Sequence, residues 1–200
     1  MYPLFETLKI TNRQPVNLEY HINRINKSRM AVGGFSDIME LPFQSLVPDT
    51  LDPAITYRCR VDYLKEIITI EHSVYYYKPI NSLKVIFAGN IDYPYKFADR
   101  LELDLLFKFR EQCDDILIIK GKSITDTSIA NIVFTDGLLY YTPAEPLLEG
   151  TCRQRLLDGK VIMALDIKVH DLSNFTGWTT INALRGFNPN MMNPMHQITF

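Results

Sequence analysis

The sequence has few of the patterns by which enzymes are usually identified. It contains no glycine-rich nucleotide loop, no zinc-ligand spacing and no Gly-x-Ser-x-Gly nucleophile motif. Its 4 histidines (His21, His72, His170 and His196) are scattered along the chain, so the sequence indicates no histidine metal cluster. We interpret each histidine as a surface residue or a hydrogen-bonded structural residue, and we expect no bound metal.

Other absences exclude whole classes of protein. The net charge of −2 offers no basic surface for nucleic acid or for an anionic membrane. No apolar run approaches the roughly 18 residues needed to span a bilayer, and residues 1–6 lack the basic and apolar stretches of a signal peptide. Cys59, Cys113 and Cys152 are odd in number and widely spaced, so we expect free thiols in a reducing cytoplasm.

The chain does have enough apolar sequence to fold. With 200 residues, of which 46% are hydrophobic and 22% charged, it can bury a core in one domain or two small ones. The first part predicts a small α+β domain over residues 1–80, in which Gly33 and Gly34 end a helix. Its expected elements are strands at 4–10, 57–63 and 67–77, a helix at 18–32, a short helix within 37–54, and a linker at 78–82.

The remainder predicts a larger α/β domain over residues 81–200. The dipeptide Asp136-Gly137 between two apolar runs is a strong hairpin signal. The expected strands are 83–88, 115–120, 130–135, 138–142, 167–170 and 178–183, with helices at 100–113 and from Thr151 onward.

Two segments carry candidate chemistry. Residues 123–153 place an acid, an Ala-Asn pair, a hairpin and a helix start in close succession, and a helix N-terminus is suited to bind phosphate. Lys96 lies upstream, just before the helix expected at 100–113, where its amine could act as a nucleophile. Together the two segments suggest a cofactor site.

Five short pieces of the sequence carry a family resemblance because of their order. They are Phe5-Glu6-Thr7, His21-Ile22-Asn23-Arg24, Tyr95-Lys96-x-x-Asp99-Arg100, residues 125–131 with Thr142-Pro143, and residues 150–153 with Ile181-Asn182-Ala183-Leu184. Together they resemble the class IV aminotransferase family, the fold-type IV pyridoxal-phosphate enzymes. The resemblance covers nearly the whole chain, and its specificity comes from the five collinear pieces rather than from any single one.

The resemblance implies an architecture as well as a chemistry. The expected fold is α+β, with the two-domain fold-type IV (D-amino-acid aminotransferase-like) architecture and a truncated N-terminus relative to the family. The family binds pyridoxal 5'-phosphate between its two domains and usually forms homodimers, so both are expected here.

The family's chemistry assigns roles to individual residues. Lys96 would bond to the aldehyde of the cofactor and move protons at the substrate α-carbon. Asp126, where the family usually has Glu, would keep the pyridine nitrogen protonated, and Arg24 would bind the phosphate. The implied cofactor-binding residues are Arg24, Lys96, Asp126, Ala130, Asn131, Thr151, Cys152, Asn182 and Ala183.

Three functional hypotheses follow from this resemblance. The Asn-Ala-Leu strand and the Lys-x-x-Asp-Arg segment favour aminodeoxychorismate lyase, which releases pyruvate and 4-aminobenzoate for folate synthesis. A branched-chain or D-amino-acid aminotransferase is the second hypothesis, and a non-catalytic paralogue is the third. Arg58 and Arg60 share one face of a strand and could bind a substrate carboxylate, although a cross-strand ion pair of one of them is an equal alternative.

Overall fold

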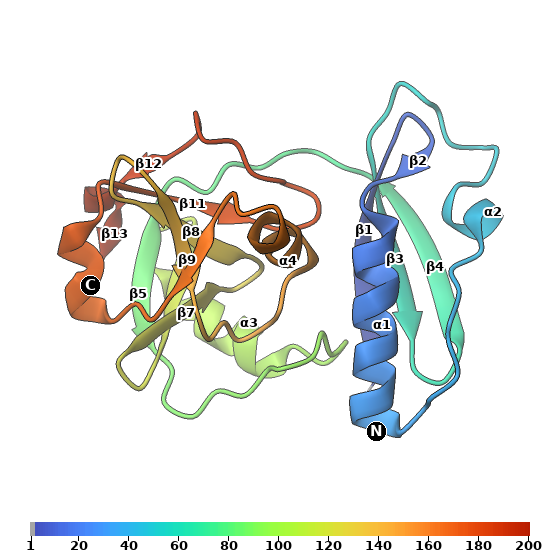
Figure 1. Cartoon of the computed structure of the whole chain (residues 1–200), viewed down its shortest axis with the longest axis horizontal. Coiled ribbons are helices and arrows are strands. Elements are labelled where there is room, and N and C mark those ends of the chain that lie inside the picture. Colours follow the sequence, from blue (N-terminus) through green and yellow to red (C-terminus); the bar gives the residue numbers. More distant parts are fainter. Residues whose placement is uncertain (1–2) are drawn as a thin grey trace. The chain divides into compact units, whose positions relative to one another are not determined.

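The computed structural model describes residues 3–200 and divides the chain into two compact units (Figure 1). The first unit contains the chain up to Tyr77 together with Tyr95–Asp99, and the second contains Lys78–Pro94 and Arg100–Phe200. The segment around Lys96, which lies beyond the domain boundary expected at residue 80, therefore packs with the first unit. Residues 1 and 2 of the expected first domain lie outside the described residues. The mixture of helices and strands confirms the α+β class.

The first unit is an antiparallel sheet with a long helix packed against it (Figure 1). Its core joins Leu4, Leu8 and Ile10 of one strand to Val61 of the next and to Ile25 of the helix. The strands predicted at 4–10, 57–63 and 67–77 are confirmed, although the last ends three residues before the expected Tyr77. The elements are β1 (Leu4–Thr11), β2 (Gln14–Pro15), β3 (Tyr57–Tyr63), β4 (Ile67–Val74), α1 (Leu18–Gly33) and α2 (Phe43–Leu46), and the strand order is β2-β1-β3-β4.

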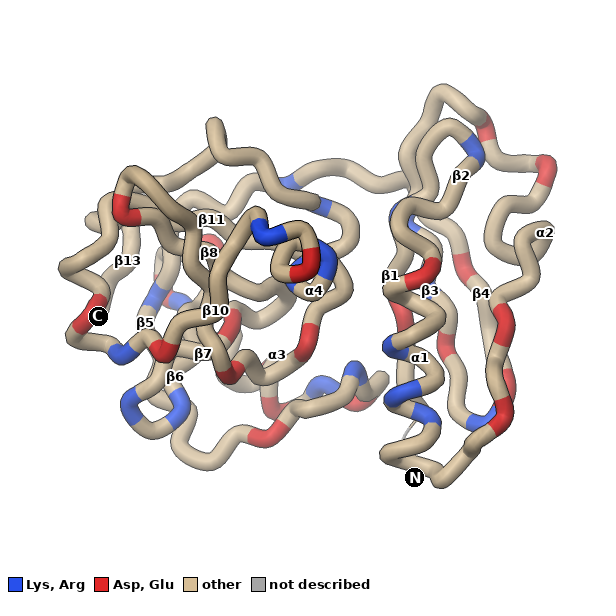
Figure 2. The backbone as a smooth tube through the Cα atoms, viewed as in Figure 1, with Lys and Arg blue, Asp and Glu red and all other residues tan. Residues whose placement is uncertain are grey.

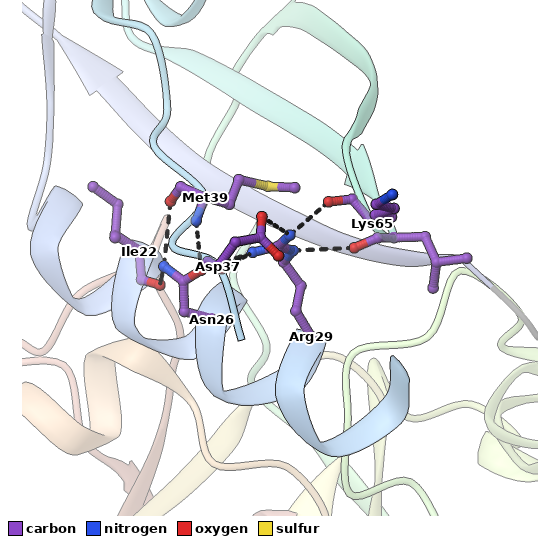
Figure 3. Close-up of polar contacts among 7 residues, drawn as sticks. Ile22, Asn26, Arg29, Asp37, Met39 and Lys65 are labelled. Atoms are coloured by element: carbon purple, nitrogen blue, oxygen red, sulfur yellow. Dashed lines mark hydrogen bonds and ion pairs between the residues drawn. The ribbon is translucent and has the colours of Figure 1, made fainter. Parts of the chain in front are cut away.

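The end of α1 is fixed by a glycine and by a buried arginine. Gly34 has a left-handed backbone (φ 68°) and its N–H donates to the Met30 carbonyl at 2.9 Å, which confirms the predicted helix stop. Arg29 is 1% exposed and donates to the carboxylate and carbonyl of Asp37 and to the carbonyl of Lys65 (Figure 3). These hydrogen bonds tie the segment after α1 and the β3–β4 turn to the helix.

The second unit is built on a larger, mixed sheet (Figure 1). Its core includes Leu117, Ile119, Ile132, Phe134 and Trp178, all of them fully buried. The strands are β5 (Leu83–Phe87), β6 (Asp115–Lys120), β7 (Ser123–Thr127), β8 (Asn131–Thr135), β9 (Tyr140–Pro143), β10 (Met163–Leu165), β11 (Gly177–Ile181), β12 (Asn193–Pro194) and β13 (Ile198–Thr199). The helices are α3 (Leu101–Phe107) and α4 (Thr151–Asp158), with 3-10 turns η1 (Lys108–Arg110), η2 (Val169–Asn174) and η3 (Met195–Gln197).

The hairpin and one strand show where the sequence predictions succeeded and failed. The Asp136-Gly137 turn is confirmed, with Gly137 at φ 97° and Asp136 Oδ1 accepting the N–H of Leu138. The strand expected at 167–170 is wrong, because Lys168 makes only an isolated bridge and the chain then turns into η2. The Lys168 N–H donates to the Asp171 carboxylate at 2.8 Å, which closes the first turn of η2 and competes with a strand.

Charge and thiols are distributed without clustering. Figure 2 shows Lys and Arg interspersed with Asp and Glu along the chain in each unit. Over residues 3–200, no helix is long and apolar enough to cross a membrane, and no group of His, Cys, Asp or Glu could hold a metal ion. Cys59, Cys113 and Cys152 are unpaired.

One buried acid at the start of β6 is incompletely satisfied. Asp115 is 1% exposed, and its Oδ1 accepts the N–H groups of Ile116 (2.8 Å) and Ser128 (3.3 Å). Within residues 3–200 its Oδ2 has no hydrogen-bond partner. Burial raises the pKa of Asp115 above its usual value.

We expect Asp115→Asn to stabilise the protein at pH 7.5 by about 1 kcal/mol, because it removes the buried charge and keeps Oδ1 as an acceptor. The raised pKa means that the wild type loses stability as the pH rises from the unfolded-state value of Asp toward the folded-state value. The gain should therefore shrink toward pH 4. Urea denaturation between pH 4 and 8 measures it, with the exposed Asp92→Asn as the control. An unchanged or lower stability of Asp115→Asn at pH 7.5 would contradict this account.

Candidate active site

Several of the residues predicted from the sequence come together in the second unit. Asp126 of β7 lies opposite Asn131, the first residue of β8, and Asn131 in turn lies opposite Ile181, the last residue of β11. The two residues after Ile181 are the predicted Asn182 and Ala183. Strand pairing therefore assembles these positions, which are separated by more than 50 residues in the sequence.

Asp126 is a buried carboxylate held by two hydrogen-bond donors. It is 4% exposed, and its Oδ1 accepts the Asn131 side-chain amide at 2.7 Å while its Oδ2 accepts the Leu148 N–H at 2.9 Å. Burial raises its pKa to about 6, against the lowering effects of the Leu148 and Asn131 hydrogen bonds and of the Arg153 charge. The group is therefore mostly ionised at neutral pH, and each oxygen has a lone pair for a further donor.

The helix that follows begins without a side-chain cap. Gly150 is the N-cap of α4 and offers no side chain to the first-turn N–H groups, and the first bond within the helix runs from the Gln154 N–H to the Gly150 carbonyl at 2.9 Å. Thr151 and Cys152 in this first turn are both buried. Backbone N–H groups and the positive end of the helix dipole make such a turn suitable for an anion.

Gly150 is required by its distance to Asn131. A Cβ atom at Gly150 would lie 2.0 Å from the Asn131 Oδ1, well inside contact distance. The Asn131 amide also donates to the Leu148 carbonyl at 2.9 Å. Asn131 thus joins Asp126 to the segment that leads into α4, and the absence of a side chain at Gly150 makes room for it.

Asn182 and Ala130 support the turn between β7 and β8. Asn182 donates to the Ile129 carbonyl at 3.3 Å, and its Oδ1 accepts the N–H groups of Leu184 and Arg185. Ala130 is buried and its N–H donates to the Thr127 hydroxyl at 3.2 Å. Both residues therefore shape the backbone beside Asp126 in this structure.

Lys96 lies in the first unit, at the edge of β1. Its carbonyl accepts the Phe5 N–H at 2.9 Å, and the adjoining Phe97 bridges to Leu4. The Lys96 ammonium is 4.5 Å from the centroid of the buried Phe5 ring, and the Arg60 guanidinium is 4.0 Å from the same ring. Phe5 thus provides a cation–π surface for both side chains.

Arg24 is held in place by a buried acid. Its Nε and Nη2 each donate to Glu6 at 2.7 Å, one to each carboxylate oxygen, and His21 Nδ1 lies 2.8 Å from Oε2. Glu6 is fully buried. Its burial acts to raise its pKa, but the Arg24 charge and the His21 hydrogen bond outweigh this and hold the pKa well below its usual range.

The two arginines predicted to bind substrate differ in their surroundings. Arg60 pairs with Asp62 on the same strand through Nε (2.7 Å) and Nη2 (2.6 Å), so its ion pair runs along β3 and is not the cross-strand pair left open by the sequence. Arg58 lies directly opposite Lys9 of β1. Within residues 3–200, neither Arg58 nor Lys9 forms an ion pair, and two like charges placed opposite each other are unfavourable unless an anion joins them.

The predicted residues thus fall into two sets, one in each unit. Arg24, Lys96, Arg58 and Arg60 belong to the first, and Asp126, Ala130, Asn131, Thr151, Cys152, Asn182 and Ala183 belong to the second. Sequence reasoning missed Glu6 as the partner of Arg24 and the Leu148 N–H as the partner of Asp126. Glu6 could have been found, because an acid in the row of Leu4, Leu8 and Ile10 must meet a buried cation.

Comparison with known proteins finds relatives that cover nearly the whole chain. No family model matches the sequence. An uncharacterized protein from Haemophilus influenzae is 37% identical over 188 residues, which are 93% of this chain and 100% of that protein. The crystal structure of a putative 4-amino-4-deoxychorismate lyase from Haemophilus somnus is 34% identical, has a TM-score of 0.86, and covers 94% of this chain and 98% of its own.

Two more distant structures share the fold. A putative amino-acid aminotransferase from Mesorhizobium loti is 20% identical with a TM-score of 0.73, covering 97% of this chain and 98% of its own. A hypothetical aminotransferase from Mycobacterium tuberculosis, in a form bound to pyridoxal phosphate, is 16% identical with a TM-score of 0.74, covering 98% of this chain and 81% of its own. These likenesses confirm the fold-type IV fold expected from the sequence.

We expect Gly150→Ala to destabilise the protein by about 1–3 kcal/mol, because the added methyl group would displace Asn131 from Asp126 and Leu148. Gly159→Ala is a matched control at the other end of α4, where φ is −76° and the nearest atom to a Cβ is 3.3 Å away. Chemical denaturation of both variants measures the difference. Equal stabilities of the two variants would contradict a packing role for Gly150.

Proposed function

The chain belongs to the class IV aminotransferase family, the fold-type IV pyridoxal-phosphate enzymes, and we propose that it is a pyridoxal-phosphate-dependent 4-amino-4-deoxychorismate lyase. The observation that carries the proposal is the buried Asp126 carboxylate beside the uncapped start of α4. An acid for a ring nitrogen and N–H groups for a phosphate are the two fixed groups that this cofactor requires. The lyase is favoured over a transaminase because one relative described as that lyase is 34% identical, whereas relatives described as aminotransferases, such as those from Mesorhizobium loti and Mycobacterium tuberculosis, are 20% or less.

The residues of the chain fit pyridoxal phosphate chemically. Asp126, with its pKa of about 6, is mostly ionised at neutral pH, and within the described residues its hydrogen bonds come from neutral donors, so a protonated ring nitrogen would complete its environment. Lys96 would supply the amine, and Arg24 and the first turn of α4 are the proposed donors for the phosphate. When bound, the cofactor would provide the electron sink that makes a proton at the substrate's amine-bearing carbon acidic.

The remaining steps fall to the side chains of the protein. Lys96 would take the proton from the carbon that carries the substrate amine, and the enolpyruvyl group would then leave from the neighbouring carbon. A proton delivered to the departing enolpyruvate completes pyruvate, and the ring that remains is 4-aminobenzoate. The cation–π contact with Phe5 restricts where the Lys96 amine can lie before the cofactor enters.

Arg58 and Arg60 are proposed to bind the carboxylates of the substrate. Arg58 is the better supported of the two, because it faces Lys9 and forms no ion pair within the described residues 3–200. Arg60 is already fixed by Asp62 and Phe5, and its charge is partly balanced. A substrate with more than one carboxylate would compensate the like charges of Arg58 and Lys9.

Three further expectations are proposals that rest on the family. We propose that the protein acts as a homodimer, in the cytoplasm, and in folate biosynthesis. The three unpaired cysteines, two of them buried, are in keeping with a reducing compartment. The alternative activity is that of an amino-acid aminotransferase, which is favoured by the fold shared with the aminotransferase structures.

We expect the purified protein to take up pyridoxal phosphate, to show the visible absorption of lysine-bound cofactor, and to lose this absorption in Lys96→Ala. The loaded protein should release pyruvate from 4-amino-4-deoxychorismate without any added keto acid, measured with a coupled lactate dehydrogenase assay. Lys84→Ala, on β5 of the second unit, is a lysine control. Turnover that requires a keto acid would establish the aminotransferase instead, and a colourless protein that binds no cofactor would overturn both.

Asp126 should control cofactor affinity in a pH-dependent way. Because its pKa is about 6, the carboxylate needed by the ring nitrogen is lost as the pH falls through 6, and affinity should fall with it. Asp126→Ala should weaken binding at pH 8 at least 10-fold, and Asp126→Glu should preserve it. Spectral titration with pyridoxal phosphate between pH 5 and 8 measures both effects, and the alanine variant shows the pH dependence that comes from the cofactor itself. An alanine variant with wild-type affinity would remove Asp126 from the site.

A further inference from the structure

Glu6 is a charged residue in an otherwise apolar row of β1. Leu4, Leu8 and Ile10 point to the same side of the strand and belong to the core, and Glu6 between them is 0% exposed. A buried carboxylate is costly to desolvate, and an apolar residue of similar size is often at least as stabilising as a buried ion pair. The stability of the first unit alone therefore gives no reason for an acid at this position.

The geometry of the ion pair points to a role for the acid. The Arg24 guanidinium meets Glu6 side-on, with Nε on one carboxylate oxygen and Nη2 on the other, both at 2.7 Å. This two-point contact fixes both the position and the plane of the guanidinium. The side chain of Arg24 is 13% exposed, whereas that of Glu6 is 0% exposed, so the arginine alone reaches the surface from the buried pair.

A second residue fixes the carboxylate itself. His21 lies three residues before Arg24 on α1, and its Nδ1 is 2.8 Å from Glu6 Oε2. His21 is 1% exposed, so this hydrogen bond is shielded from water. The Thr7 N–H adds a weaker contact to the same oxygen at 3.3 Å. Glu6 is thus held by β1 and by α1, and it cannot turn without breaking several hydrogen bonds.

We propose that Glu6 is a positioning residue that fixes the Arg24 guanidinium for the phosphate of the cofactor. The proposal rests on the proposed function, which assigns the phosphate to Arg24. An arginine held in a single orientation before binding loses less conformational entropy when the phosphate arrives. The negative charge of Glu6 also weakens the attraction between Arg24 and the phosphate. The gain from orientation must exceed this loss, and the sign of the measured change in affinity decides which of the two is larger.

The test compares pyridoxal phosphate with pyridoxal, which has the aldehyde and the ring but lacks the phosphate. Dissociation constants of both are measured by spectral titration of the apoprotein. Glu6→Gln places an amide N–H₂ against the donors of Arg24, and we expect pyridoxal phosphate to bind about 10-fold more weakly while pyridoxal binds as in the wild type. Glu19→Gln, an exposed glutamate in the first turn of the same helix, is the matched control and should leave both constants unchanged.

Each other outcome has a defined meaning. Equal weakening of both ligands would show a merely structural role for Glu6, and unchanged or tighter binding of pyridoxal phosphate would show that orientation does not matter; either result overturns the proposal. If Glu6→Gln does not fold, His21→Gln keeps the Arg24–Glu6 pair and should reduce the same selectivity by a smaller factor, and an unchanged selectivity would overturn the proposal. Arg24→Ala tests the role of Arg24 separately from that of Glu6. If Arg24→Ala leaves pyridoxal phosphate binding intact, the role assigned to Arg24 is wrong. If Arg24→Ala selectively weakens pyridoxal phosphate binding and Glu6→Gln does not, the role of Arg24 stands and only the role proposed for Glu6 is wrong.

Discussion

The hydrogen bonds of the Asn131 side chain join the parts of the second unit on which the candidate site depends. One amide donates both to the Asp126 carboxylate of β7 and to the Leu148 carbonyl of the segment before α4, while Asn131 itself begins β8. The Leu148 N–H closes the arrangement by donating back to Asp126. A buried carboxylate, a helix start and two strands are therefore fixed relative to one another by a single residue, which in turn requires a glycine at position 150.

The two buried acids Glu6 and Asp126, one in each unit, are accommodated in opposite ways. Glu6 lies against Arg24 and His21, and they outweigh the effect of burial, so its pKa falls. Within the described residues Asp126 receives hydrogen bonds from neutral groups, and burial outweighs them, so its pKa rises to about 6. The first arrangement suits an acid that stays ionised and holds an arginine. The second leaves a carboxylate that is stabilised when a cation lies beside it. A protonated cofactor ring would be such a cation.

The sequence predicted those features that depend on local rules, and it missed those that depend on distant partners. The α1 helix, its glycine stop and the Asp136-Gly137 hairpin follow from periodicity and turn chemistry within a few residues. Strand β7 was missed because Thr125, Asp126 and Thr127 are polar, and they are buried only because hydrogen bonds from elsewhere satisfy them. The site residues were identified from the resemblance, since no local rule distinguishes Asp126 from an ordinary turn aspartate. The contact of Arg24 with Glu6 required the pairing of α1 with β1.

The second unit carries buried polar groups that weaken it as a folded domain. Asp115 Oδ2 and the Arg153 Nε are buried without hydrogen-bond partners within the described residues 3–200, and burial lowers the pKa of Arg153. Such groups are retained when a site needs them, and their cost is offset by a core like the one that surrounds Trp178 and Phe134. Arg153 has a direct connection to the site, because its charge favours the ionised form of Asp126. Together with the larger effects of the Leu148 and Asn131 hydrogen bonds, this charge acts against burial and lowers the pKa of Asp126. The charge on the acid that would face the cofactor therefore depends in part on Arg153, whose Nη2 donates to the Pro143 carbonyl at 2.8 Å.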